Sequence, residues 1–193
     1  LRSRYSRKSD HDKLLNDLAF LREHYFNDPN YLRIDGRPVI FVYLTRVYFR
    51  NQGHDSLAKM RKLFPEVYLV GDDVYGPKYK SEWAKPFDAV TTYDVYGQSL
   101  SKYGGTRKAV KVLGENYRVA KKAANQVGTA FIPTVAPGYN DTAVRRGHPG
   151  RGRYFTDVEG SKEGDIFRSM IKNVALPNLD PKAGNLLMVT SFN

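Results

Sequence analysis

Short apolar runs that alternate with helical segments are the feature that most limits how this chain can fold. The runs are rich in β-branched residues and almost without polar interruptions, which is typical of strands buried on both faces of a parallel sheet. An alternation of strand and helix favours such a sheet. The five predicted strands are residues 37–43, 66–71, 88–93, 129–135 and 186–192.

Helical spacing of apolar residues marks the segments between the strands. One predicted helix has Leu14, Leu18, Leu21 and Tyr25 on a single stripe and ends before the breakers at residues 27–30. Residues 75–86 lack this spacing and are predicted to form a loop. The other predicted helices are residues 54–64, with Leu57, Met60 and Phe64 inward; 106–127, with Ala109, Leu113, Ala120, Ala123 and Val127 inward; and 166–174.

Two architectures fit this pattern, a small doubly wound open sheet and part of an eight-stranded barrel. No Gly-rich phosphate-binding fingerprint follows any predicted strand, so the nucleotide-binding form of the open sheet has little support. A complete barrel typically needs about 250 residues. The chain has 193 residues and begins with Leu1, which suggests a processed or excised piece.

Composition excludes several classes of function. The chain has no cysteine, which excludes disulfides, thiol catalysis and cysteine-ligated zinc. His148 has no partner histidine at useful spacing, and His11, His24 and His54 fall on or beside predicted helices. We therefore expect no metal site, and we expect no cofactor. No apolar run reaches the roughly 18 residues of a membrane span. A net charge of +11 favours an anionic partner, and the fourteen tyrosines suit surfaces that bind sugars or proteins.

Polar side chains follow the predicted strands. The carboxyl ends of parallel strands open on one face, where active sites lie. Aspartates can accept hydrogen bonds from sugar hydroxyls and tyrosine rings can stack on sugar faces. We therefore predict a carbohydrate site in which Tyr43, Asp72, Asp94, Tyr139 and Asn193 converge. The full set of predicted substrate-binding residues is Tyr43, Asp72, Asp94, Tyr96, Tyr139, Asp141 and Asn193.

The predicted site lacks a pair of catalytic carboxylates. A glycosidase usually needs one carboxyl as an acid and a second as a nucleophile or base. None of the six glutamates directly follows a predicted strand, and only aspartates do. Asp72 and Asp94 have a second interpretation, because aspartate is a favoured cap and turn residue.

Three segments resemble glycoside hydrolase family 99, the endo-α-mannosidase and mannanase family, and its close barrel relatives. The segments are "YLRIDGRPVIFVY", "FIPTVAPGYNDTAVR" and "VTSFN", in that order, and the resemblance extends from about Asp12 to the last residue. In that family the last strand continues as Asn-Glu-Trp-x-Glu, and the two glutamates are catalytic. The resemblance implies that these glutamates come directly after Asn193, so the catalytic residues of this chain remain unknown.

The resemblance implies an α/β fold of the (β/α)8 barrel type with about five parallel strands in this chain. Residues 1–193 would form a single partial barrel domain with a basic segment at residues 1–9. It also implies a retaining, endo-acting hydrolase of α-mannosides or a related polysaccharide, in which the 2-hydroxyl of the substrate is the nucleophile. Tyr43 and Tyr139 would line the sugar site and Asp141 would support its loop. A secreted, periplasmic or secretory-pathway location follows from the family alone.

This chain departs from the family pattern at two strand ends. The family often has Asp-Ser after the tyrosine of the first strand, where this chain has Leu44 and Thr45, and residues 92–97 match only loosely. Related polysaccharide-biosynthesis proteins classed with glycosyltransferases share the "GRPV" strand. Their last strand usually reads Asn-Ala-Trp-Asn, so the Thr-Ser-Phe-Asn of this chain favours the hydrolase.

A basic segment, "VRRGHPGRGRYF", follows the predicted Tyr139 mouth. Arginine side chains match carboxylate, sulfate and phosphate groups, so this segment predicts an anionic glycan ligand. Arg-Gly spacing also occurs in RNA-binding segments, but a parallel barrel is not built for that chemistry and we expect no nucleic-acid partner. A solvent-exposed loop without a ligand is the simpler interpretation. The predicted anion-binding residues are Arg145, Arg146, Arg151 and Arg153.

Two classes of function therefore stay open. One is a glycoside hydrolase represented by a partial chain. The other is a non-catalytic carbohydrate- or polyanion-binding domain. If the chain is complete as given, its sheet has open edges and an exposed apolar interior, and we expect an oligomer or low stability.

Overall fold

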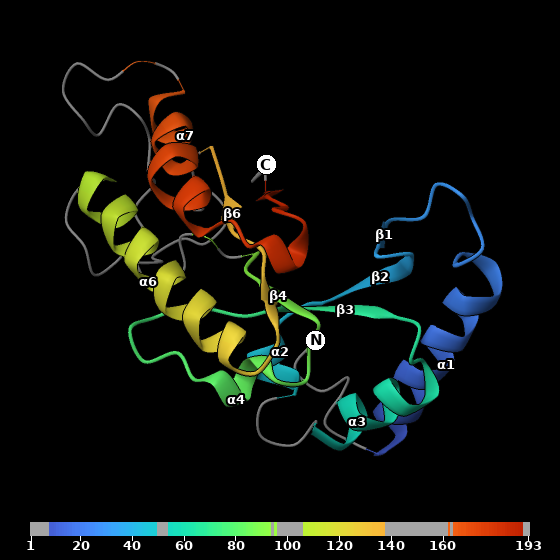
Figure 1. The fold of residues 1–193 in the computed structure, drawn as a ribbon. Helices are drawn as coiled ribbons and strands as arrows, with labels where there is room; N and C mark the ends of the chain where they lie inside the picture. Colours follow the sequence, from blue (N-terminus) through green and yellow to red (C-terminus); the bar gives the residue numbers. More distant parts are fainter. Residues whose placement is uncertain are drawn as a thin grey trace, which may run out of the picture.

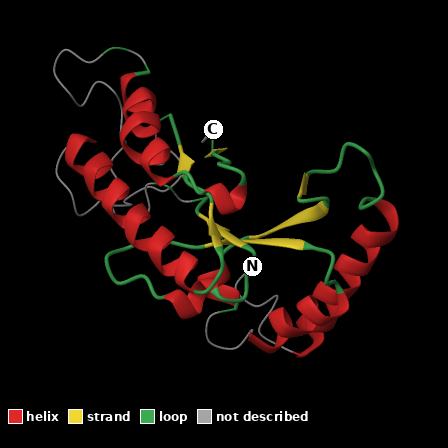
Figure 2. Ribbon diagram, viewed as in Figure 1, coloured by secondary structure: helices red, strands yellow, loops and turns green. Residues whose placement is uncertain are grey.

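The computed structural model describes residues 8–49, 54–93, 95, 106–137, 162 and 164–190. Four parallel strands form the centre of the sheet in chain order, and a further parallel pair continues it. Helices lie along the outer side of this curled sheet (Figures 1 and 2). The strands are β2 (Arg37–Val42), β3 (Tyr68–Asp72), β4 (Ala89–Thr91), β5 (Ala130–Phe131), β6 (Thr134–Val135) and β7 (Met188–Val189).

The predicted strand at residues 129–135 is divided into β5 and β6 around Pro133. Before the division, Ile132 N–H donates to the Val90 carbonyl of β4 at 2.9 Å. After it, the Pro133 carbonyl accepts from Met188 N–H of β7 at 3.0 Å. The chain therefore changes its pairing partner where proline has no N–H to donate, and the sheet curls at this point.

Helices cover the outer side of the sheet where amphipathic segments were predicted. The predicted inward positions Leu57, Met60 and Phe64 are buried. Tyr25 was predicted on the stripe of the first helix, but that helix ends at His24, and Tyr25 lies just beyond it with a residue exposure of 47%. The helices are α1 (Lys8–His24), α2 (Thr45–Tyr48), α3 (His54–Leu63), α4 (Ser81–Ala84), α6 (Thr106–Gln126) and α7 (Asp165–Met170), followed by the π-helical turn η2 (Ile171–Ala175) and the 3-10 turns η3 (Leu176–Asn178) and η4 (Pro181–Ala183).

Two local elements were not predicted. Strand β1 (Arg33–Ile34) pairs antiparallel with the start of β2. Asp35 and Gly36 join the two strands, both with positive φ, which is the conformation of a tight two-residue hairpin turn. The short helix α4 lies within the segment predicted as a loop at residues 75–86.

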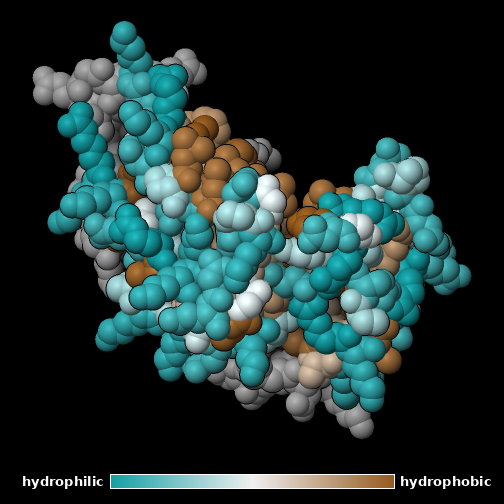
Figure 3. Space-filling model, in the orientation of Figure 1, coloured by the Kyte–Doolittle hydropathy of each residue, from teal (hydrophilic) through white to brown (hydrophobic). Residues whose placement is uncertain are grey.

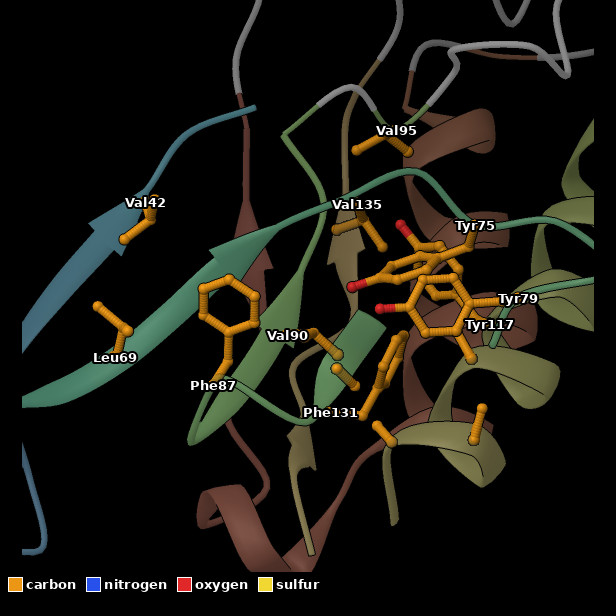
Figure 4. Close-up of a cluster of buried hydrophobic side chains, with 14 of the residues drawn as sticks. Val42, Leu69, Tyr75, Tyr79, Phe87, Val90, Val95, Tyr117, Phe131 and Val135 are labelled. Carbon is orange, nitrogen blue, oxygen red and sulfur yellow. The ribbon is translucent and has the colours of Figure 1, made fainter. Parts of the chain in front are cut away.

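The larger hydrophobic core lies between the sheet and the helices. Aromatic rings form its centre on the α6 side, where Tyr75, Tyr79, Tyr117 and Phe131 gather (Figure 4). Tyr117 meets Phe131 edge-on with ring centroids 5.4 Å apart, and both side chains are fully buried. Such pairs add about 0.5–1.5 kcal/mol to the free energy gained from burial alone.

A smaller core lines the inner side of the sheet toward the amino ends of the strands. It contains Val39, Tyr68, Val70, Ala89, Ala130 and Ile132. Toward the carboxyl ends of the strands the inner side opens. Phe41 is 50% exposed and Tyr43 is 53% exposed, although β2 was predicted to be buried on both faces. That prediction holds for Val39 and is wrong for the inner face at Phe41 and Tyr43, because among the described residues nothing closes the barrel opposite this end of β2.

The described sheet is thus a curled, mostly parallel half-barrel with helices outside, and the predicted fold class is confirmed. Figure 3 shows a hollow in the surface of the molecule, with hydrophobic residues along it. None of the helices in the described part of the chain is long and apolar enough to span a membrane.

Candidate carbohydrate site at the carboxyl ends of the strands

Three polar residues lie together at the carboxyl ends of β2, β3 and β4. Two of them, Tyr43 and Asp72, were predicted as ligands, and the third is Tyr93. Tyr43 follows β2, Asp72 ends β3 and Tyr93 follows β4 closely. The register pairs Val42 with Gly71 and Asp72 with Thr91, so these strand ends lie at the same level. Tyr43 and Asp72 therefore lie at one end of the sheet, as predicted.

The Asp72 carboxylate connects the three strand ends. Its Oδ2 accepts from Leu44 N–H at 3.0 Å, and its Oδ1 accepts from Tyr93 N–H at 2.6 Å. The side chain is buried, with a residue exposure of 6%. Each carboxylate oxygen thus holds the backbone next to one tyrosine, which is the role of a positioning residue.

Burial shifts the pKa of this carboxyl. Desolvation raises the pKa of Asp72 above its ordinary value, while the hydrogen bonds from Tyr93 and Leu44 N–H and the positive charge of Arg46 act in the opposite direction. Neighbouring Asp73 adds a smaller raising effect.

The turn after β2 has an unusual backbone conformation. Leu44 adopts a left-handed conformation with φ of 53°, which costs free energy for a residue with a Cβ. Two contacts hold it: its own N–H donates to Asp72, and the hydroxyl of Thr45 donates to the Asp72 carbonyl at 2.5 Å. The Leu44–Thr45 pair, where the family often has Asp-Ser, therefore ties β2 to β3 at the mouth.

Tyr43 and Tyr93 form an aromatic pair at this mouth. Their ring centroids are 5.4 Å apart and their planes are at 86°, so one ring meets the other edge-on. Tyr43 is 53% exposed and Tyr93 is 43% exposed. Both residues are thus about half exposed while their backbone is held by Asp72, a combination that suits contact with the apolar face and hydroxyl groups of a sugar.

The inner wall beside the pair is lined by threonines. Thr91 hydroxyl lies 2.8 Å from Thr134 hydroxyl and 3.0 Å from the Ile132 carbonyl. The hydroxyl of Tyr117 donates to the Thr134 carbonyl at 2.7 Å. These bonds connect β4 and α6 to β6 and satisfy hydroxyls that are buried, since Thr91 is 1% exposed and Thr134 and Tyr117 are not exposed at all.

Most predicted site residues lie outside the described part of the chain. They are Asp94, Tyr96, Tyr139, Asp141 and Asn193, together with Arg145, Arg146, Arg151 and Arg153. Of the predicted set, the structure places Tyr43 and Asp72, which it brings together.

Tyr93 is a residue of the described mouth that was not predicted as a ligand. The period of two along β4 was a usable signal. Tyr93 follows Thr91 by two residues and so belongs to the inner face, as Tyr43 does in β2. Among the described residues no group of three histidine, aspartate or glutamate side chains is arranged to hold a metal ion.

Comparisons with known proteins identify a similar fold among solved structures. No protein-family model and no curated protein matches the chain. A solved glycoside hydrolase-like protein matches 95% of this chain with 17% identity and a TM-score of 0.66, over 52% of its own length. The GH99 endo-α-mannosidase from Bacteroides thetaiotaomicron matches 95% of this chain with 18% identity and a TM-score of 0.64, over 49% of its length.

A second structure of that endo-α-mannosidase, in complex with bis-tris-propane, matches with 18% identity and a TM-score of 0.60, over 95% of this chain and 52% of that one. The chain thus has a glycoside-hydrolase-like fold. It spans about half the length of each of these solved proteins.

Proposed function

We propose that this chain is part of the catalytic barrel of a retaining, endo-acting glycoside hydrolase that cleaves α-mannosides or a related polysaccharide. The observation that carries the proposal is the Tyr43–Tyr93 pair, held by Asp72 at the carboxyl ends of a half-barrel. The likeness of this half-barrel to the GH99 endo-α-mannosidase supports the choice of substrate.

In this proposal the two tyrosines contact the sugar and Asp72 positions them. Asp72 is not proposed as the acid or the nucleophile, because both of its oxygens accept backbone hydrogen bonds and the side chain is buried. The other predicted ligands of the mouth are Asp94, Tyr96, Tyr139, Asp141 and Asn193.

The catalytic carboxylates are proposed to come from the segment that follows Asn193 in the full protein. No glutamate of the described residues lies at the carboxyl end of a strand. A glycosidase usually needs two carboxyl groups, one on each side of the scissile bond. The resemblance of "VTSFN" to the family's last strand implies that both follow Asn193. The role of the four arginines at 145–153 as ligands of anionic groups on the same glycan stays a prediction.

The test uses the full-length protein and measures release of oligosaccharides from α-mannan. The configuration of the first product, followed by proton NMR, distinguishes retention from inversion. Tyr43→Ala and Tyr93→Ala are expected to weaken substrate binding and lower kcat/KM by about tenfold or more. Stacking of a nucleic-acid base on an aromatic side chain contributes about 1–3 kcal/mol, and we expect a sugar face on a tyrosine ring to contribute a similar amount. Tyr25→Ala is the matched control, because Tyr25 is 47% exposed at the end of α1.

Two results would contradict the proposal. An equal loss of activity in the Tyr25→Ala variant would show that the loss does not come from contacts at the mouth. Binding of α-mannan without release of any product by the full-length protein would favour the non-catalytic carbohydrate-binding domain.

A further inference from the structure

Helix α6 has a row of positive side chains on its outer face. At about 100° per residue, Arg107, Lys111, Arg118 and Lys122 fall within an arc of about 60° and extend over about 22 Å of the helix. All four are exposed, and Glu115 is the one acidic residue of the helix. We refer to these four residues as the α6 basic face.

The exposure of this face does not depend on what lies beyond the edges of the described sheet. The opposite face of α6 is buried in the large core through Leu113, Tyr117 and Ala120. Along its flanks α6 contacts α4 on one side and α7 with η2 on the other, as Figure 1 shows. Strands and helices that complete the barrel beyond β2 or β7 would therefore leave the α6 basic face open.

The four cations have no partner among the described residues. Neither an ion pair nor a hydrogen bond of their side chains occurs within that part of the chain. Arg37 and Arg61, by contrast, are both paired with Asp88. Like charges four residues apart, as in Arg107 with Lys111 and Arg118 with Lys122, repel each other and destabilise a helix. Glu115, four residues after Lys111 and three before Arg118, offsets part of this repulsion but leaves the face with an excess of positive charge. An anionic ligand would remove this repulsion.

The side chains around the face limit the kind of ligand. The exposed positions of α6 are all polar, so the face has no apolar residue to insert into a membrane. It also has no exposed aromatic ring on which the bases of a single-stranded nucleic acid could stack, because the one aromatic residue of α6, Tyr117, is buried. A straight row of cations suits an extended polymer with repeated carboxylate or sulfate groups.

We propose that the α6 basic face binds an anionic polysaccharide, composed of uronic acid or sulfated sugars, on the outside of the barrel. Arginine binds carboxylate and sulfate through two parallel hydrogen bonds, and lysine contributes a point charge. This site is separate from the mouth at Tyr43 and Tyr93. It goes beyond the proposed hydrolysis, because it holds a polymer without taking part in bond cleavage.

The experiment compares two variants of the full-length protein that each lose four positive charges. The first is Arg107→Gln, Lys111→Gln, Arg118→Gln and Lys122→Gln combined. The matched control is Lys59→Gln, Lys62→Gln, Lys78→Gln and Lys85→Gln, four exposed lysines on other elements. Glutamine is a good helix former, and circular dichroism checks that both variants are folded.

Binding of polygalacturonate is measured by calorimetry at several salt concentrations. The α6 variant is expected to bind about 40-fold more weakly, at roughly 2.5-fold for each of the four exposed charge pairs lost, and to show a shallower salt dependence. The control variant is expected to bind as the parent protein does. Neutral α-mannan, vesicles of phosphatidylcholine with phosphatidylserine, and polyuridylate serve as comparison ligands.

Equal weakening in both variants would overturn the proposal, because net charge alone would explain the binding. Tighter binding of the vesicles or of polyuridylate than of polygalacturonate would also overturn the proposal, because it would identify the ligand as a membrane or a nucleic acid. Hydrolysis of α-mannan is measured separately and is expected to be unchanged in the α6 variant, so failure of this proposal and failure of the proposed hydrolysis are distinguishable.

Discussion

Replacement of Asp88 by asparagine is expected to destabilise the half-barrel by about 3 kcal/mol. Asp88 precedes β4 at the amino end of the sheet and accepts hydrogen bonds from two arginines. Arg37 donates to both oxygens, at 3.0 and 3.1 Å, and Arg61 donates to Oδ2 at 2.6 Å. The N–H of Leu69 donates to Oδ2 at 2.7 Å. The carboxylate thus joins β2, α3, β3 and β4.

The magnitude follows from the burial of the three side chains. Removing one partner of a buried ion pair costs about 3–5 kcal/mol, because the remaining charge is left without compensation. The Asp88 side chain is 19% exposed, but those of Arg37 and Arg61 are 33% and 30% exposed. Water can compensate the arginines in part, so we expect the low end of that range.

The pKa of Asp88 adds a pH dependence with a defined sign. Burial alone would raise this pKa, but the hydrogen bonds from Leu69 N–H, Arg37 and Arg61 outweigh burial and lower it below its ordinary value. A lowered folded-state pKa means that the stabilisation is complete above the unfolded pKa of about 3.9 and is lost as the pH falls through the folded value. The difference between parent and variant should therefore be constant from neutral pH to about pH 5 and shrink below about pH 4.

Urea unfolding at a series of pH values measures this difference. Asp165→Asn is the matched control, because Asp165 also pairs with an arginine, Arg168, but at the surface of α7. We expect a much smaller loss in the control, because Asp165 is exposed and water screens its interactions with Arg168 and the Lys162 N–H. A loss below about 0.5 kcal/mol for Asp88→Asn would refute the reasoning, since that is the value of an exposed surface pair.

Two further substitutions test the packing around the sheet. Gly71→Ala is expected to destabilise the protein by about 1–3 kcal/mol, because an added Cβ would lie 2.8 Å from the Phe87 ring, whereas Gly76→Ala meets nothing within 4 Å and should be close to neutral in thermal unfolding. Tyr117→Phe removes the hydroxyl that donates to the Thr134 carbonyl at 2.7 Å in a fully buried position; we expect a loss of about 1–2 kcal/mol in urea unfolding, and an unchanged stability would show that this bond has no net value.

The sequence by itself determined the positions of the strands and the buried faces of the helices. Leu57 and Met60 of α3, like Ala120 and Leu113 of α6, are buried where the spacing predicted. These properties depend on the period of apolar residues along a few turns or one strand, which is a local pattern that a single sequence contains. The parallel, barrel-type sheet follows from the same pattern, because strands that alternate with helices pair in parallel.

Only the tertiary structure decided which residues meet at the mouth. Tyr43 and Tyr93 are far apart in the sequence, and their contact exists because β2 and β4 both pair with β3 at one level. The sequence placed Asp72 at the end of a predicted strand, a position that suits both a turn residue and a ligand. Nothing in the sequence pattern predicted that its carboxylate is buried and accepts hydrogen bonds from two backbone N–H groups. Nor did the pattern show that the inner face at Phe41 is exposed. A face is buried only if another element packs over it. The local order of residues in a strand does not show which element that is, or whether there is one.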